Sequence, residues 1–367
     1  MNRMIISNLA QRPIRSIISI VAVAIEVSMI LLIVGLSLGM LKDSKTRQYG
    51  IGADVLVRPP GSSMMNAFNS ASVSVKVADV LAKRPQVAAV APVVMHVTST
   101  TNIEIIYGID LKSFEAVGGP FQYIHGGPFQ GPDDMIVDDL FAASNKTKVG
   151  STIHLFNHDF RVCGIVPNGR GARRFIPMKT MQDLIEAPGK ASAFYVKLDN
   201  PQLAEQAVQD FKAIPGMSEY SIMTMRDVVS LFSPDHIPML NNFINAVVGI
   251  AMVIGFLVIF QSMYTAVMER TREIGILKSL GASKAYIVRV ILRETLVLAL
   301  AGIVVGVVLS FIASGSIHRI VPTMPVQFTG GWILRAAIIA IVGAMIGAVY
   351  PAFKAAQKDP IDALAYE

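Results

Sequence analysis

Four long apolar stretches, at about 14–41, 242–268, 288–312 and 332–350, limit what this chain can fold into. Each is long enough to cross a hydrocarbon core of about 30 Å as a helix. Hydrophobic residues make up 53% of the chain and charged residues only 16%, whereas ordinary globular chains carry about 25% charged residues. A single stretch could be a buried core helix, but four of this length predict an α-helical membrane protein with four transmembrane helices.

The segment 42–241, between the first two stretches, has the composition of a folded domain. It holds 19 Lys and Arg against 19 Asp and Glu, and about 200 residues suffice for a core of its own. Its one cysteine, Cys163, excludes an internal disulfide. Free cysteines are among the most buried residues in proteins, so we expect this thiol to be buried. Runs of period two alternate with short helical patterns, which predicts an α+β domain with a smaller β-rich sub-lobe at about 118–190. The expected strands are 51–58, 87–98, 102–109, 152–156, 160–166 and 193–198, and the expected helices are 75–83 and 202–212.

The net charge of +6 is concentrated beside the apolar stretches, because the segment 42–241 is neutral overall. Cytoplasmic loops of membrane proteins carry an excess of Lys and Arg. This rule predicts a cytoplasmic lead 1–13, loop 269–287 and tail 351–367, with 42–241 and the loop 313–331 on the outer side. Both termini are then cytoplasmic, and no nucleic-acid partner is needed to explain the basic charge. The cations on the inner side are Arg3, Arg12, Arg15, Arg270, Arg272, Lys278, Lys284, Arg289, Arg293, Lys354 and Lys358, whereas the loop 313–331 holds only Arg319.

The stretch 269–284, ERTREIGILKSLGASK, combines charged residues with aliphatic ones at helical spacing. It predicts a short amphipathic helix that ends near Gly281, followed by a second helix capped by Ser283. Ile274, Leu277 and Leu280 would be unfavourable in water, so they require a groove in a partner or a place in the lipid interface. The residues alone leave these two alternatives open at even odds.

This stretch, followed by an apolar helix and by the C-terminal YPAFKAAQKDPIDALAYE, resembles the FtsX-like, MacB-like family of permeases of ATP-binding-cassette (ABC) transporters. The order of one span, a large external domain and three more spans is similar to that family too. The resemblance implies a multi-pass protein of the bacterial inner membrane that works by mechanotransmission. It implies a permease homodimer, in contact with membrane lipids, and a separate ATPase subunit that binds the ATP. This chain would then need no cofactor of its own. The resemblance leaves open whether a periplasmic adaptor also takes part.

The resemblance also implies that the loop between the second and third spans is a coupling helix that docks on the ATPase. Glu294, in RETLVLALAG, matches the family pattern and would link this helix to the spans; the alternative is an interfacial pair with Arg293. The residues assigned to ATPase coupling are Glu269, Arg270, Arg272, Glu273, Ile274, Gly275, Leu277, Lys278, Leu280, Gly281 and Glu294.

Catalytic motifs are missing from the printed sequence. It has no Gly-x-x-x-x-Gly-Lys-Ser/Thr loop, no Gly-x-Ser-x-Gly elbow and no His-Glu-x-x-His pair. His154 and His158 lie across an expected hairpin turn at 157–159, where a four-residue spacing does not make a metal pair. We therefore expect a non-catalytic subunit without a metal. Glu26, in the middle of the first span, is either functional or a polar contact that holds helices together.

These observations favour the permease subunit of an ATP-driven export or extraction complex. The alternative is a mechanotransmitting regulator that pulls on a periplasmic cell-wall hydrolase and transports nothing. A membrane-anchored sensor without an ATPase is a third, weaker interpretation. The sequence does not identify a substrate.

Overall fold

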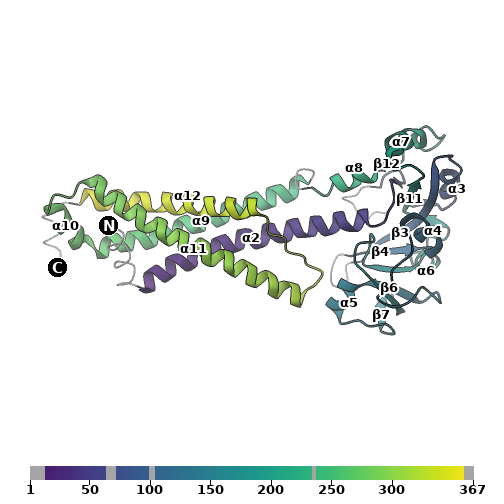
Figure 1. Ribbon diagram of the computed structural model, residues 1–367, viewed down its shortest axis with the longest axis horizontal. Helices are drawn as coiled ribbons and strands as arrows, with labels where there is room; N and C mark the ends of the chain where they lie inside the picture. The colour runs from purple at the N-terminus through teal and green to yellow at the C-terminus, as the bar shows by residue number, and fades with distance from the viewer. Residues whose placement is uncertain (1–12, 63–71, 99–103, 234–236, 359–367) are drawn as a thin grey trace. The chain divides into compact units, whose positions relative to one another are not determined.

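The computed structural model describes residues 13–62, 72–98, 104–233 and 237–358. Within them the chain forms two compact units, each described here by itself (Figure 1). Of the described residues, those within 13–39, 238–319 and 326–358 form the helical unit, and those within 40–237 and 320–325 form the sheet unit. The predicted lead 1–13 lies outside the described residues except for Pro13, and so does the predicted tail beyond Lys358.

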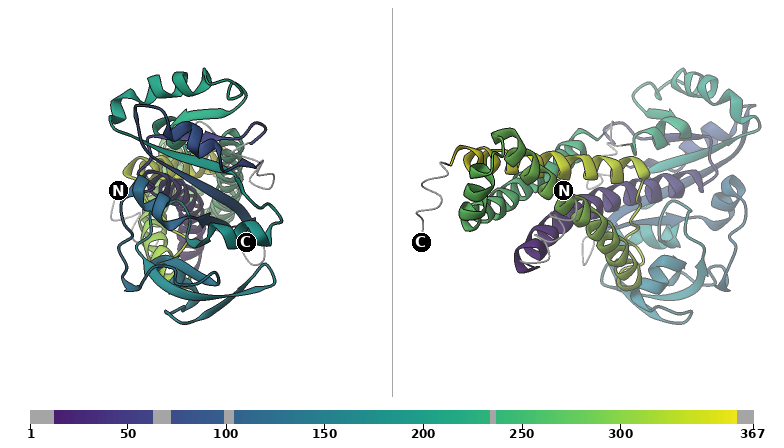
Figure 2. Two further views of the ribbon diagram at one scale, coloured as in Figure 1. Left: turned by 90° about the vertical axis from the view of Figure 1, so that its right-hand side faces the viewer. Right: turned by 60° about the vertical axis from the view of Figure 1, so that its left-hand side comes forward.

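The helical unit contains four helices that are long and apolar enough to cross a membrane, as the sequence predicts. They are α2 (Pro13–Tyr49), α9 (Pro238–Glu269), α11 (Lys284–Ile320) and α12 (Gly330–Gln357), and a short helix, α10 (Thr271–Ser279), connects α9 to α11. α9 and α12 lie side by side (Figure 2).

The helices extend beyond the predicted spans. α2 continues past residue 41 to Tyr49, α11 runs from Lys284 to Ile320, and α12 continues to Gln357. Hydropathy marks only the apolar part of a helix, whereas backbone hydrogen bonding continues into polar flanks. Pro351 lies inside α12 without ending it, since proline removes only one backbone donor and neighbouring helices compensate for such a loss in membrane bundles.

Glycines allow close contacts between these helices. A methyl group at Gly306 would lie 2.7 Å from the Ala24 carbonyl oxygen, and one at Gly302 would lie 2.6 Å from Val23 Cβ, so α11 packs closely on α2. The contact between α12 and α9 is equally close, because a methyl group at Gly347 of α12 would lie 2.8 Å from the carbonyl oxygen of Phe256 in α9. Small residues at four-residue spacing commonly permit such approach between membrane helices.

The sheet unit is an α+β fold built on one mixed sheet. Its strand order is β12-β1-β11-β3-β4-β9-β6-β8-β5, with β7 paired to β8; β2 and β10 form a separate pair. The β4–β9 and β6–β8 pairs are parallel and the others antiparallel. The strands are β1 (Val55–Arg58), β2 (Val73–Ser74), β3 (Val87–Thr98), β4 (Glu104–Ile109), β5 (His125–Gly126), β6 (Asp134–Asp138), β7 (Thr152–Leu155), β8 (His158–Val166), β9 (Arg174–Pro177), β10 (Lys190–Ala191), β11 (Ala193–Leu198) and β12 (Ser221–Thr224). The helices are α3 (Val77–Ala82), α4 (Leu111–Gly118), α5 (Asp139–Asn145), α6 (Met178–Leu184), α7 (Ala204–Lys212) and α8 (Met225–Ser230), with a 3-10 turn at Pro201–Leu203.

The two faces of the sheet follow the strand period of two. In β3, Ala91 and Val93 face a core that α4 and α8 complete, whereas Val90 and Val94 face the opposite side. That opposite side is covered by α3 and α7 at one end and by α5 and α6 at the other. Both faces are buried, so the sheet unit has a core on each side.

Three details differ from the sequence expectations. The segment 118–190 is not a separate sub-lobe, because its strands continue the main sheet through the parallel β4–β9 pair. The β7–β8 turn is Phe156–Asn157, both with positive φ, one residue before the expected 157–159. Cys163 is half-buried rather than fully buried; its thiol contacts the Met135 carbonyl, and burial raises its pKa to about 11.

Replacing Gly302 or Gly306 by alanine should lower the melting temperature of the detergent-solubilised chain, because each new methyl group meets α2. Gly315→Ala is the matched control in the same helix, where a methyl group meets nothing within 4 Å. All three substitutions favour the helix by up to about 1 kcal/mol, so the difference from the control isolates the steric effect. Equal stabilisation at all three positions would contradict the close α2–α11 contact.

Candidate functional site

The connection between α9 and α11 has the turn chemistry that its sequence predicts. α9 ends at Glu269, Arg270 leaves the helical conformation, and α10 begins at Thr271. Gly281 has φ +94°, which permits the reversal after α10. The Ser283 hydroxyl oxygen then accepts a hydrogen bond from the Tyr286 amide at 3.2 Å and so caps α11. The connection is therefore a defined helix, followed by a capped turn into α11.

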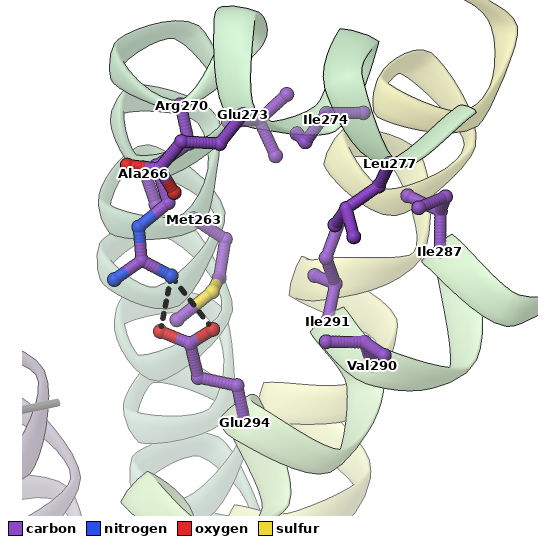
Figure 3. Close-up of a pocket in the computed structure, with 11 residues that line it drawn as sticks. Met263, Ala266, Arg270, Glu273, Ile274, Leu277, Ile287, Val290, Ile291 and Glu294 are labelled. Atoms are coloured by element: carbon purple, nitrogen blue, oxygen red, sulfur yellow. Dashed lines mark hydrogen bonds and ion pairs between the residues drawn. The ribbon is translucent and has the colours of Figure 1, made fainter. Parts of the chain in front are cut away.

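One side of α10 packs against the helical unit itself. Ile274 is buried against Val267 and Ile287, and Leu277 packs partly against the same cluster. Figure 3 shows these side chains around a pocket of about 60 Å³, which holds only a few water molecules at most. The pocket is a gap beneath α10 rather than a ligand site.

A buried ion pair fastens the start of α10 to α11. The Arg270 guanidinium donates to both Glu294 carboxylate oxygens, at 3.2 and 3.4 Å (Figure 3). The two side chains are only 12% and 6% exposed. Separating a buried pair would leave each charge uncompensated in a poorly solvated site, which is costly. The pair therefore holds the start of α10 against α11.

A third contact connects α10 to the end of α12. The Lys278 ammonium donates to the Ala356 carbonyl at 3.0 Å and to the Lys358 carbonyl. The last carbonyls of a helix lack intrahelical partners, and a cation there also interacts favourably with the helix dipole. Continuity with α9, the ion pair to α11 and Lys278 thus hold α10 to three long helices.

The structure corrects which aliphatic residues face outward. Ile274 and Leu277, expected to need an external groove, pack inside the helical unit, and Gly275 lies on the same buried side of α10. The exposed aliphatic residues are Leu280, at 80%, which the sequence selects, and Ile276, at 44%, which it does not. Their four-residue spacing was the available signal. Glu269, Arg272, Glu273 and Gly281 are exposed around them.

Glu26 lies inside the helical unit, on α2, and is 4% exposed. A methyl group at Gly255 of α9 would lie 1.9 Å from its Oε2, so the carboxyl group occupies the space that this glycine leaves. Within the described residues its Oε1 has no hydrogen-bond partner. Arg335 lies over the Trp332 ring, 5.0 Å from its centroid, rather than beside Glu26.

A second polar cluster lies in the sheet unit, at the end of α2. Arg173 donates to Asp43 of α2 at 2.9 Å and to Asp138 at 3.1 Å, and Asn168 donates to Asp43 at 3.0 Å. Arg173 also contacts the Thr323 carbonyl at 3.4 Å. Burial raises the pKa of Asp138 to about 6, although Arg173 and the Phe141 amide act in the opposite direction. The cluster fastens the end of α2 and the segment 320–325 to the sheet.

His154 and His158 pair with different carboxylates. His154 Nδ1 lies 2.7 Å from Asp159 and His158 Nε2 lies 2.8 Å from Asp133. These pairs lie at the surface of the β7–β8 hairpin, and each histidine interacts with its own carboxylate rather than with the other.

Two family models match the two parts of the chain. The FtsX-like permease C-terminal model matches residues 245–360, and the MacB-like periplasmic core domain model matches residues 16–214, more than half of the chain. The chain belongs to the MacB-type, FtsX-like family of ABC transporter permeases. Members of this family are permease-type membrane proteins, in agreement with the four apolar helices.

Named relatives of this MacB-type permease include the macrolide export ATP-binding/permease protein MacB of Mannheimia succiniciproducens. It is 23% identical over 395 residues, which cover all of this chain and 60% of the relative's length. The uncharacterized ABC transporter permease YknZ of Bacillus subtilis is 33% identical over 151 residues, covering 40% of this chain and 37% of YknZ. The crystal structure of the periplasmic region of MacB from Actinobacillus actinomycetemcomitans is 19% identical, covers 50% of this chain and 94% of that one, and gives a TM-score of 0.38.

Replacing either Arg270 or Glu294 by alanine should destabilise the helical unit by about 3–5 kcal/mol, because the other charge stays buried without its partner. The double variant Arg270→Ala/Glu294→Ala should lose less than the sum of the two single variants, since neither charge of the pair remains without its partner. Thermal unfolding in one detergent measures the cycle. Arg272→Ala, exposed on the same helix, is the control and should stay within about 0.5 kcal/mol of the original chain. Additive losses would show that the two side chains do not act as a pair.

Proposed function

We propose that this chain is the permease subunit of an ATP-driven export or extraction complex, and that α10 is the element on which an ABC ATPase acts. One observation carries the proposal: α10 is fastened to α9, α11 and α12 while Ile276 and Leu280 stay exposed. Two exposed aliphatic side chains on an otherwise fixed helix suit a groove in a protein partner.

The contacts of α10 explain how a push on it could be transmitted. A helix of nine residues is marginal by itself, so a partner that moved an unattached α10 would only displace a loop. Here the Arg270–Glu294 pair and the Lys278 contact would pass the displacement to α11 and α12. α2 continues into the sheet unit, where Asp43 and Arg173 fasten its end. We propose that this is how cytoplasmic ATP hydrolysis moves the external domain.

The comparisons support an ATPase partner. The MacB relatives are named as ATP-binding/permease proteins and the relative YknZ as an ABC transporter permease, so both names connect the permease with an ATP-binding cassette. We propose a separate ATPase subunit, a permease homodimer and an inner-membrane location with both termini cytoplasmic. The cations beside α10, α11 and α12 support this orientation.

The double variant Ile276→Asp/Leu280→Asp should abolish co-purification of the ATPase, because charges would replace the apolar contact. The tagged chain would be purified from membranes of its own host. The measurements are mass-spectrometric detection of a chain with a Gly-x-x-x-x-Gly-Lys-Ser/Thr motif, and ATP hydrolysis by the purified material.

Ile320→Asp is the matched control, because Ile320 is 75% exposed but lies at the far end of α11. It should retain the ATPase. The double variant should keep the melting temperature of the original chain, since both replaced side chains are exposed. Normal ATPase recovery with the double variant would refute the docking role of this face.

A further inference from the structure

A groove of about 610 Å³ lies between α11 and α12, on a different side of α11 from the Arg270–Glu294 pair. Its size falls within the range of about 300–1,000 Å³ that is usual for small-molecule sites. Its lining includes Lys284, the first residue of α11, and Gln357, the last residue of α12. The groove therefore opens at the ends of two membrane-spanning helices, where lipid head groups meet the hydrocarbon.

The lining of the groove is amphipathic. Lys284, Arg289 and Arg293 contribute three cations over the first nine-residue interval of α11, which corresponds to about 14 Å of helix. No carboxylate occurs among the described residues that line it. Glu294, next to Arg293 in sequence, faces the other pocket and pairs with Arg270. The described lining of the groove is therefore positively charged.

Apart from Gln357, the remainder of the lining is apolar, and much of it is partly exposed. Leu292 and Leu296, four residues apart, form one wall, and Phe353 of α12, 55% exposed, stands at the other. A soluble anion would contact the cations but leave these walls uncovered. An occupant with an anionic head and hydrocarbon chains would satisfy both parts.

A second copy of this chain fits the groove poorly. In a two-fold symmetric contact the same patch faces itself, so this groove would bring six cations together without a carboxylate from its lining. Basic pockets between membrane helices at the interface are instead suited to acidic head groups.

We propose that this groove binds one anionic phospholipid, with its phosphate against Lys284 and Arg289 and its acyl chains along Leu292, Leu296 and Phe353. The proposal concerns a surface that the coupling role does not use, and it holds whichever side of the membrane α10 faces. It can therefore fail or succeed independently of ATPase docking.

The test uses the full chain, delipidated in detergent and titrated with dioleoylphosphatidylglycerol or dioleoylphosphatidylcholine, with native mass spectrometry counting bound lipids. We expect one phosphatidylglycerol per chain, retained in preference to phosphatidylcholine. Arg289→Gln should weaken this binding about fivefold, and Lys284→Gln/Arg289→Gln about 25-fold, since each cation near a membrane surface contributes about 1 kcal/mol. Arg272→Gln removes a cation outside the groove and should leave lipid binding unchanged.

A further variant separates the groove from surface charge. Ala285→Trp keeps all three cations but puts an indole into the groove, so it should also reduce lipid retention. Wild-type retention by this variant would mean that the lipid is held without entering the groove, and would overturn the proposal. Equal retention of the two lipids would overturn it too, as would binding of sn-glycerol 3-phosphate as tight as that of phosphatidylglycerol. If Ala285→Trp changed the oligomeric mass of the chain but not its lipid binding, the occupant of the groove would be a second copy and the proposal would fail.

Discussion

The buried ion pair between Arg270 and Glu294 is the contact on which the account of α10 depends. Taking two charges out of water is costly unless the geometry satisfies both, and here one guanidinium nitrogen bridges both carboxylate oxygens. Without this pair, α10 would be a nine-residue helix attached through its neighbours in sequence, the apolar packing of Ile274 and the Lys278 contact. With it, the connection is part of the helical unit, and its exposed face is presented in a fixed position. A helix that receives force from a partner has to be fixed in this way, because a mobile loop would absorb the displacement.

Much of the fold could be predicted from the sequence because local patterns determine it. The four spans follow from uninterrupted apolar length, and β3 and β11 have the boundaries that their β-branched and apolar residues predict. Gly281 and Ser283 act at the turn as expected because capping is a local interaction. The continuous sheet was not predicted, since β4 and β9 pair across a long sequence separation. Where each helix ends was also missed, because polar flanks continue the helical backbone.

The error at the candidate site has a similar cause. Ile274, Gly275, Ile276 and Leu277 are consecutive, so their side chains cover every direction around a helix with 3.6 residues per turn. Their order alone cannot tell which aliphatic residues face inward. That choice is made by Val267, Ile287 and Ile291, which belong to the neighbouring helices. The contact of Lys278 with Ala356, 78 residues away in sequence, could not be predicted from local spacing either. The charged loop thus divides into residues that fasten α10 and residues that remain available to a partner.

The most direct test of the account is to measure, by cysteine labelling, on which side of the membrane α10 and the sheet unit lie. A Cys163→Ala chain carrying one new cysteine, Ser279→Cys on α10 or Asp199→Cys in the sheet unit, would be treated with a membrane-impermeant maleimide; both positions are exposed. In spheroplasts the reagent should modify Asp199→Cys and spare Ser279→Cys, and in inverted membrane vesicles it should do the reverse. Modification of both cysteines from the same side would contradict the claim that α10 is an internal element coupled to an external domain.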